Sequence, residues 1–282
     1  MDVISNSAAR HARLREEELS IDEYLALCQS DPMAYASAAQ RMLAAIGEPE
    51  MVDTRKDPRL SRLFANKVIR RYPAFAEFYG MEDAIEQVVS FFRHAAQALE
   101  ERKQILYLLG PVGGGKSSIA ERLKYLMQKV PFYALKGSPV NESPLGLFDA
   151  AEDGPVLEEQ FGIPRRCLQH VLSPWAVKRL EEYGGDIRHF RVVKRYPSIL
   201  RQVAIAKTEP GDENNQDISS LVGKVDIRKL ENFAQDDTDA YSYSGGLCLA
   251  NQGLLEFVEM FKAPIKVLHP LLTATQEGNY KG

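Results

Sequence analysis

The chain has 282 residues, 45% of them hydrophobic, so it can bury a core as one large domain or two smaller ones. Its formal net charge of −4 argues against a general binder of nucleic acid or of membrane surfaces. No apolar run reaches the roughly 18 residues that span a bilayer, and the polar N-terminus lacks a signal-peptide core. Three widely spaced cysteines support neither a disulfide framework nor a zinc site, and these features together favour a cytoplasmic protein.

Two short helices are predicted within the first fifty residues. A capping box at Ser20 and Glu23 starts the first helix, and the dipeptide Asp31-Pro32 supplies a start signal for the second. Gly47 ends the second helix, because glycine readily adopts the backbone conformation of a helix C-terminus. A charged connector follows. We therefore expect a helical N-terminal segment.

Apolar residues recur at helical spacing from Met81 to about Leu99, and a change of pattern follows this helix. The run QILYLLG at 104–110 is typical of a buried parallel strand, KSSIAERLKYLMQKV at 116–130 of a helix, and PFYALKG at 131–137 of a second strand. The order of strand, turn, helix and strand indicates an α/β domain. The predicted division is a helical segment over 1–75 and a second domain over 76–282.

The later part of the chain is more mixed. A helix is plausible after Ser173-Pro174, and the basic stretch 188–201 is better explained as a solvated or subunit-facing surface than as a nucleic-acid site. The polar segment 207–217 predicts an exposed loop. A glycine pair at 245–246 then precedes a predicted strand at 253–261 and a final helix.

The segment from Gly110 to Ser117 fits the pattern G-x-x-x-x-G-K-[ST], between a predicted strand and a predicted helix. Such a loop directs successive backbone N–H groups at a phosphate, while Lys116 neutralises phosphate oxygens and the Ser117 hydroxyl ligates Mg²⁺. The alternative is a glycine-rich turn that binds nothing. The residues expected to bind the nucleotide phosphates are Gly110, Pro111, Val112, Gly113, Gly114, Gly115, Lys116, Ser117 and Ser118.

ATP hydrolysis also needs an acidic residue at the end of a second strand, to hold Mg²⁺ or to polarise the attacking water. The strand GLLEFVEMF at 253–261 is the best candidate to supply it.

These segments resemble the AAA+ ATPases, in particular the clade with a hairpin before the Walker B strand. The resemblance implies a three-layer α/β/α P-loop domain, a hairpin formed by GLCLANQG at 246–253, and a Walker B strand formed by GLLEFVE at 253–259. It places Tyr79, Gly80 and Met81 near the adenine base.

The Walker B strand departs from the AAA+ pattern at one position. Val258 stands where these ATPases usually carry an aspartate, and valine cannot ligate Mg²⁺. Glu259 follows it as the expected catalytic base, against the alternative of a solvated carboxylate. Glu256 lies on the same face of the strand as Val258 and is a weaker candidate for a metal ligand.

Nearly the whole chain is similar to the PrkA-type serine protein kinases of bacteria, through segments such as YPAFAEFYGMEDAIEQ, YLLGPVGGGKSSIAERLK and FKAPIKVLHPLLTATQEGNY. The resemblance implies ATP and Mg²⁺ as cofactors, a homo-oligomer, a serine-containing protein substrate and a role in stress responses. Members of this family continue past the position of Gly282, so we expect a fragment whose parallel sheet is incomplete and lacks sensor strands and lid.

Two other functions remain open on the sequence. The chain can be a nucleotide-gated interaction module that binds ATP and hydrolyses little of it, a possibility that Val258 favours. It can also belong to a machine that remodels or degrades proteins, as many AAA+ ATPases do. Neither a membrane partner nor a nucleic-acid partner is expected.

Overall fold

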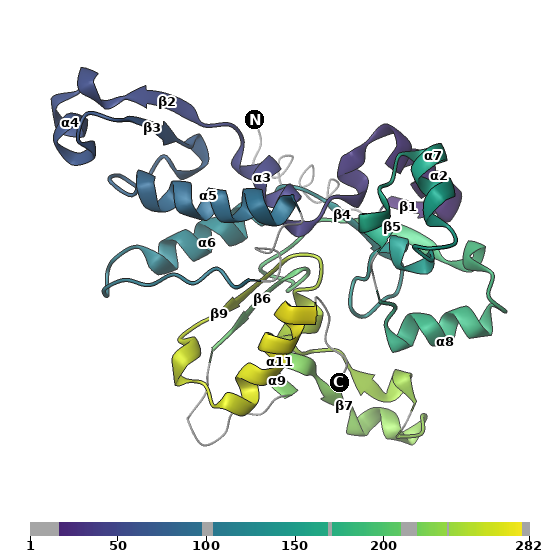
Figure 1. Ribbon diagram of the computed structural model, residues 1–282. Coiled ribbons are helices and arrows are strands. Elements are labelled where there is room, and N and C mark those ends of the chain that lie inside the picture. The colour runs from purple at the N-terminus through teal and green to yellow at the C-terminus, as the bar shows by residue number, and fades with distance from the viewer. Residues whose placement is uncertain (1–16, 98–103, 169–170, 210–218, 236, 278–282) are drawn as a thin grey trace, which may run out of the picture.

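The computed structural model describes residues 17–97, 104–168, 171–209, 219–235 and 237–277 (Figure 1). Helices and strands are mixed along this length, in agreement with the α/β class. The strands form one three-stranded sheet, β1-β5-β4, and three two-stranded sheets. Within these ranges no helix combines the length and the apolar composition needed to cross a bilayer.

The first helix starts where the sequence predicts. Strand β1 (Glu17–Ser20) leads into α2 (Ile21–Ser30), and the Ser20–Glu23 capping box is confirmed by two reciprocal hydrogen bonds of 3.1 and 2.7 Å. The second helix starts later than predicted. Asp31 caps only a 3-10 turn (Pro32–Tyr35), and α3 (Ala38–Ile46) begins at its own capping box, formed by Ser37 with Gln40.

The segment after Gly47 is more ordered than a connector. Strands β2 (Glu50–Asp53) and β3 (Val68–Arg71) pair antiparallel, and α4 (Pro58–Phe64) lies between them in the chain. Both strands are short and mostly exposed, so they lack the alternation of polar and apolar residues by which a half-buried strand is recognised. The described part of the 1–75 segment is therefore not purely helical.

The first hydrophobic core is formed by three helices packed together. Helix α5 (Glu82–Ala96) confirms the predicted helical pattern and packs against α3, which also packs against α6 (Lys116–Met127). The buried residues of this core include Met42, Ile85, Val89, Phe92, Ile119, Leu123, Leu126 and Met127. The helix predicted at 116–130 therefore forms and buries an apolar face in this core.

The predicted strand at 104–110 is absent. None of the described strands exchanges a ladder of backbone hydrogen bonds with this segment, and a strand exists only where a partner completes the ladder. The backbone still alternates in its exposure: Leu106 and Leu108 pack against the first core, while Tyr107 and Leu109 face outward. The apolar run is thus half buried rather than fully buried.

Strand β4 (Phe132–Leu135) forms where predicted but does not continue a parallel unit. It pairs antiparallel with β5 (Arg191–Arg195), which also pairs antiparallel with β1. Helices α7 (Gly154–Phe161) and α8 (Pro174–Glu182) help to enclose a second hydrophobic core beside this sheet, and Ser173 caps α8 as its sequence indicates. Of the predicted strand–helix–strand unit, the helix and the second strand form, but the first strand is absent and the second pairs antiparallel.

The parallel pair in the described structure is formed by β6 (Ile205–Thr208) and β9 (Leu254–Phe257). Strand β9 confirms the core of the predicted strand at 253–261, and α11 (Ile265–Glu277) confirms the helix after it. The predicted hairpin at 246–253 is wrong, because its first residues form the short helix α10 (Gly246–Leu249). Most of the predicted loop at 207–217 lies outside the described residues.

Two further short elements complete this region. Helix α9 (Ser219–Val222) contacts both α10 and α11, and strands β7 (Lys224–Val225) and β8 (Tyr241–Ser242) pair antiparallel.

A buried arginine connects the parts of the fold. The Arg41 side chain, on α3, is 1% exposed, and its guanidinium lies 5.3 Å from the centre of the Phe132 ring on β4. It donates hydrogen bonds to the Met127 sulfur at the end of α6 and to the Gln252 carbonyl just before β9. Burial lowers the pKa of Arg41 to about 10. One side chain thus joins α3, α6, β4 and the start of β9.

Replacing Arg41 should therefore destabilise the whole fold. We expect Arg41→Ala to lower the free energy of unfolding by about 3 kcal/mol or more, because it opens a cavity and leaves a buried carbonyl unpaired. Arg41→Met fills most of the cavity and should cost less. Denaturant unfolding measures both, with the exposed Arg201→Ala as control; equal midpoints for Arg41→Ala and Arg201→Ala would contradict this role.

Candidate functional site

The glycine-rich loop before α6 has the backbone conformation that its glycines allow. Gly113 and Gly115 have φ angles of +79° and +78°, in the left-handed region that other residues adopt at a cost. The Gly114 N–H donates to the Pro111 carbonyl at 3.1 Å, and the Ile119 N–H donates to the Gly115 carbonyl at 2.9 Å as α6 begins. The loop therefore ends directly on a twelve-residue helix.

The residues present fit a phosphate group at this loop. The Lys116 ammonium folds back over it and donates to the carbonyls of Gly110 and Pro111, at 2.7 and 2.6 Å. Ser117 and Ser118 are exposed in the first turn of α6, where free N–H groups and the helix dipole favour an anion. The structure thus brings a cation, two hydroxyls and a helix N-terminus together in one exposed place.

The segment expected near the base lies against this loop. A methyl group added at Gly115 would lie only 3.0 Å from the Met81 sulfur, so Met81 packs directly on the loop backbone. Gly80 has a φ angle of +76°, which turns the chain between Met81 and Tyr79. The Tyr79 side chain is 88% exposed beside the helix. The two predicted parts of the nucleotide site are therefore neighbours.

A hollow of about 390 Å³ lies at this junction, and the sequence analysis did not identify its charged residues. Tyr79, Glu77 and Arg122 line it together with Pro73, Ala74 and Ala76. Arg122 forms an ion pair with Glu77 and lies over the Tyr125 ring, 5.5 Å from its centre. Arg122 is four residues after Ser118 and so lies on the same face of α6. This spacing would have identified Arg122 from the sequence as a neighbour of the glycine-rich loop.

Glu259, the predicted base, follows strand β9 in a left-handed conformation with a φ angle of +50°. Its side chain is 55% exposed and forms an ion pair of 2.9 Å with Lys262. The preceding residue, Val258, continues the parallel ladder, since its N–H donates to the Thr208 carbonyl at 2.9 Å. In this structure the Glu259 carboxylate is paired with Lys262 at the surface.

Glu256, the weaker metal candidate, points from β9 to helix α6. Its carboxylate lies 2.6 Å from the Lys124 ammonium, which is also 2.7 Å from Glu121. Burial lowers the pKa of Lys124, but hydrogen bonds to the two carboxylates outweigh it and leave the pKa raised. Lys124 is seven residues, or about 10 Å of helix, beyond Ser117. Glu256 therefore neutralises a cation in the second half of α6.

Lys124 was not identified from the sequence. Its side chain is 3% exposed, and it sits between the apolar residues Leu123 and Leu126 on α6. Lys124 could have been identified only by considering α6 and β9 together, because a cation on a buried helix face needs an acidic partner and Glu256 on β9 supplies one.

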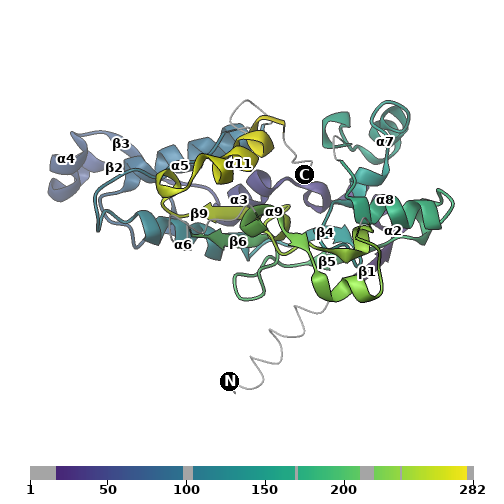
Figure 2. The same cartoon turned by 90° about the horizontal axis from the view of Figure 1, so that it is seen from below.

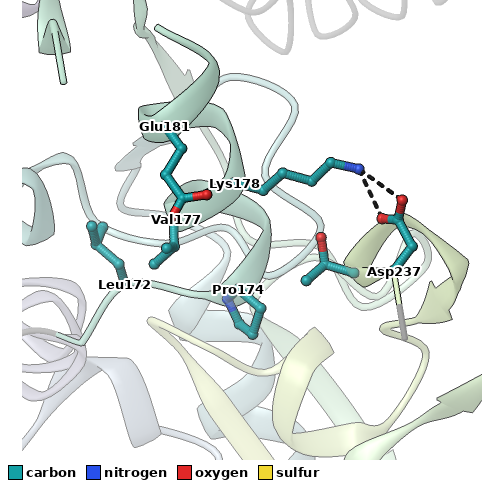
Figure 3. Close-up of a pocket in the computed structure, with 7 residues that line it drawn as sticks. Leu172, Pro174, Val177, Lys178, Glu181 and Asp237 are labelled. Carbon is teal, nitrogen blue, oxygen red and sulfur yellow. Dashed lines mark hydrogen bonds and ion pairs between the residues drawn. The ribbon is translucent and has the colours of Figure 1, made fainter. Parts of the chain in front are cut away.

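A second hollow, of about 440 Å³, lies beside α8 and away from the glycine-rich loop (Figure 3). Lys178 reaches across it to Asp237 at 2.8 Å and to Asp239 at 2.6 Å. Hydrogen bonds to these two carboxylates raise the pKa of Lys178. Its charge is fully compensated, and this hollow contains none of the residues predicted to bind a nucleotide.

Comparison with known proteins identifies the family. The PrkA AAA domain family matches residues 19–282, so the chain belongs to it. The chain is 68% identical over its whole length to "Serine/threonine kinase YeaG" of Escherichia coli strain K12, covering 44% of that protein. It is 35% identical over 95% of its length to "ATP-dependent protease PrkA" of Bacillus subtilis strain 168, covering 43%.

The chain therefore spans less than half the length of these curated relatives. No solved structure matches the chain significantly.

A double-mutant cycle tests the pair between the helix and β9. We expect Lys124→Met to lower the free energy of unfolding by about 2 kcal/mol, because it leaves Glu256 partly buried without its cation. Glu256→Gln should lower the free energy of unfolding less in the Lys124→Met background than in wild type. Denaturant unfolding of wild type, the two single variants and the double variant measures this. Additive effects would show that the pair is not a stabilising contact.

Proposed function

We propose that this chain is the Mg-ATP-binding AAA+ module of a PrkA-like serine protein kinase. The observation that carries the proposal is the exposed glycine-rich loop with Lys116 folded over it at the N-terminus of α6. A loop with left-handed glycines, a lysine and a helix N-terminus is the arrangement that cradles nucleotide phosphates. The family is consistent with ATP as ligand.

Each residue of the loop has a separate task in this proposal. The backbone N–H groups of residues 113–118 bind the phosphates, and Lys116 moves from the loop carbonyls to the phosphate oxygens. The Ser117 hydroxyl would hold Mg²⁺, which would neutralise the negative charge of the phosphates. Tyr79, Gly80 and Met81 flank the base, and Arg122 bounds the hollow beside them.

Glu259 acts as the base that polarises the attacking water. To do so its carboxylate must leave Lys262, which is a small cost because exposed ion pairs contribute only about 0–1 kcal/mol. Val258 offers no ligand to Mg²⁺, and Glu256 is occupied by Lys124, so Mg²⁺ depends on Ser117 and on the nucleotide itself.

The full-length protein would then use ATP to drive or regulate phosphorylation of serine residues in a protein substrate, in the cytoplasm and during stress. We further propose a homo-oligomer and, in the complete domain, a three-layer α/β/α arrangement. The relative named "Serine/threonine kinase YeaG" supports the kinase assignment.

A second function is a nucleotide-gated interaction module that binds ATP and hydrolyses little of it. The observation that favours it is the pairing of Glu259 with Lys262 next to Val258. A machine that remodels or degrades proteins is a further candidate, supported by the relative named "ATP-dependent protease PrkA".

The loop is tested with Lys116→Ala in the full-length protein. We expect ATP affinity to fall roughly 10- to 100-fold, because charge-assisted hydrogen bonds to the phosphates are lost. Isothermal titration measures binding, and Lys129→Ala, an exposed lysine near the end of the same helix, is the control. Unchanged ATP affinity in Lys116→Ala would exclude the phosphate-binding role of the loop.

A separate assay with casein as substrate distinguishes the kinase from the protease-like machine. ATP-dependent degradation without phosphorylation would favour the protease-like machine over the kinase.

The base is tested with Glu259→Gln. We expect ATP binding to persist and phosphate release to fall roughly 100-fold or more, since a general base contributes about that factor. Mg²⁺-dependent phosphate release measures turnover, and Lys262→Ala, which frees the carboxylate, should retain it. If wild-type protein binds ATP and releases almost no phosphate, the nucleotide-gated module is the correct function. If Glu259→Gln releases phosphate as fast as an active wild type, Glu259 is not the base.

A further inference from the structure

Charge is separated between two ends of the molecule. At one end lies the basic arm, which we define as residues 50–71 and which comprises β2, α4 and β3. This arm contains three carboxylates, Glu50, Asp53 and Asp57. It contains seven cations: Arg55, Lys56, Arg59, Arg62, Lys67, Arg70 and Arg71. The excess of positive charge contrasts with the net charge of −4 of the whole chain.

Part of this positive charge is used within the chain. Arg55 pairs with Asp53, Arg71 with Glu50, and Arg70 with Glu86 on α5. The remaining four cations are exposed and form no ion pair with any described residue: Lys56, Arg59, Arg62 and Lys67. They surround α4 and are free to meet an acidic partner.

Apolar side chains are exposed among these cations. Met51 is 63% exposed, Leu63 is 59% exposed and Val68 is 51% exposed. A mixture of cations and exposed apolar side chains is typical of a protein–protein contact, whereas a nucleic-acid surface relies on cations and polar groups.

At the other end lies the acidic face, which we define as the exposed side of α2 and α7 with the turn that leads into α7. These helices pack together, and the Gln29 amide donates to the Gln160 carbonyl at 3.0 Å. Neither residues 17–40 nor residues 141–164 contain a lysine or arginine. These two stretches contain eleven carboxylates. Glu142 is buried, and Glu17, Glu18 and Glu158 form ion pairs; the others are Asp22, Glu23, Asp31, Asp149, Glu152, Asp153 and Glu159.

Several carboxylates of the acidic face are also free. Asp22, Glu152 and Glu159 are exposed, and none forms an ion pair within the described part of the chain. Val156, on α7, is 49% exposed among them. The acidic face thus offers carboxylates for the unpaired cations of the basic arm and an apolar side chain for its exposed apolar residues.

The two surfaces cannot meet within one molecule. The basic arm and the acidic face lie at opposite ends in both views of the chain (Figures 1 and 2). A second copy can satisfy both surfaces, with the arm of one molecule against the acidic face of the next. Such a contact joins different patches on the two copies, so it repeats into a ring or a filament.

We propose that the basic arm docks on the acidic face of a second copy of this protein, head to tail. The proposal rests on the proposed homo-oligomer and names the surfaces that form it. Electrostatic complementarity of this kind sets orientation and speeds association, and it weakens as salt screens the charges.

The test uses charge reversal in the full-length protein. The arm variant carries Lys56→Glu, Arg59→Glu and Arg62→Glu, and the face variant carries Asp22→Lys, Glu152→Lys and Glu159→Lys. We expect each variant alone to assemble roughly tenfold or more weakly than wild type, because like charges now oppose each other. Sedimentation velocity at low and high ionic strength measures the assembly.

Mixing the two variants is the decisive measurement. The arm variant then has two acidic ends and the face variant two basic ends, so an alternating assembly restores every contact. We expect the mixture, and also a protein that carries all six substitutions, to recover wild-type assembly. A control matched to the arm variant carries Arg201→Glu, Lys224→Glu and Arg228→Glu, which lower the net charge by the same amount on other surfaces, and it should assemble like wild type.

Four outcomes would overturn the proposal. If assembly is unchanged in both variants, or lost in both without recovery on mixing, the interface is wrong while the homo-oligomer stands. If wild type is monomeric at every ionic strength, the homo-oligomer fails with it. If the arm variant assembles normally but loses binding to a mixed-sequence DNA duplex, the arm serves nucleic acid. ATP titration of each variant separates these results from failure of the nucleotide site.

Discussion

The guanidinium of Arg41 is the contact on which the arrangement of this protein depends. A buried cation without a carboxylate is expensive, and it persists because the Phe132 ring and the Gln252 carbonyl surround it. Gln252 in turn donates to the carbonyl of Tyr133, within β4, and to the carbonyl of Asn141, after β4. The N-terminal helix α3 therefore connects the antiparallel sheet to the segment from which β9 starts.

The same set of contacts gives α6 two unequal halves. Its second half is held by Met127 against Arg41 and by Lys124 against Glu256 on β9. Its first half carries Lys116 and the exposed serines, with Met81 packed on the loop before it. A helix anchored at its far end presents its N-terminus as a fixed dipole, so an anion bound there meets donors that are already oriented.

Local signals allowed several elements to be predicted from the sequence. The capping residues Ser20 and Ser173, and the pattern from Gly110 to Ser117, depend on neighbours within a few residues, and their backbone forms as expected. The strand at 104–110 and the parallel pairing of β4 depended on partners far along the chain, and both were wrong. Periodicity reports which face is buried but says nothing about which strand lies beside it.

Arg41 and Lys124 show the same limit for side chains. Each lies on an amphipathic helix, where a single charged residue is ordinarily solvated, and each is buried only because a distant segment covers it. The same distinction between local and distant signals applies to the two proposed steps at the candidate site, ATP binding and ATP hydrolysis. The phosphate loop is encoded within nine consecutive residues, whereas Glu259 depends on where Arg41 and Gln252 place the start of β9. Under the proposed function, substitutions in the core should therefore impair hydrolysis while the loop retains nucleotide binding.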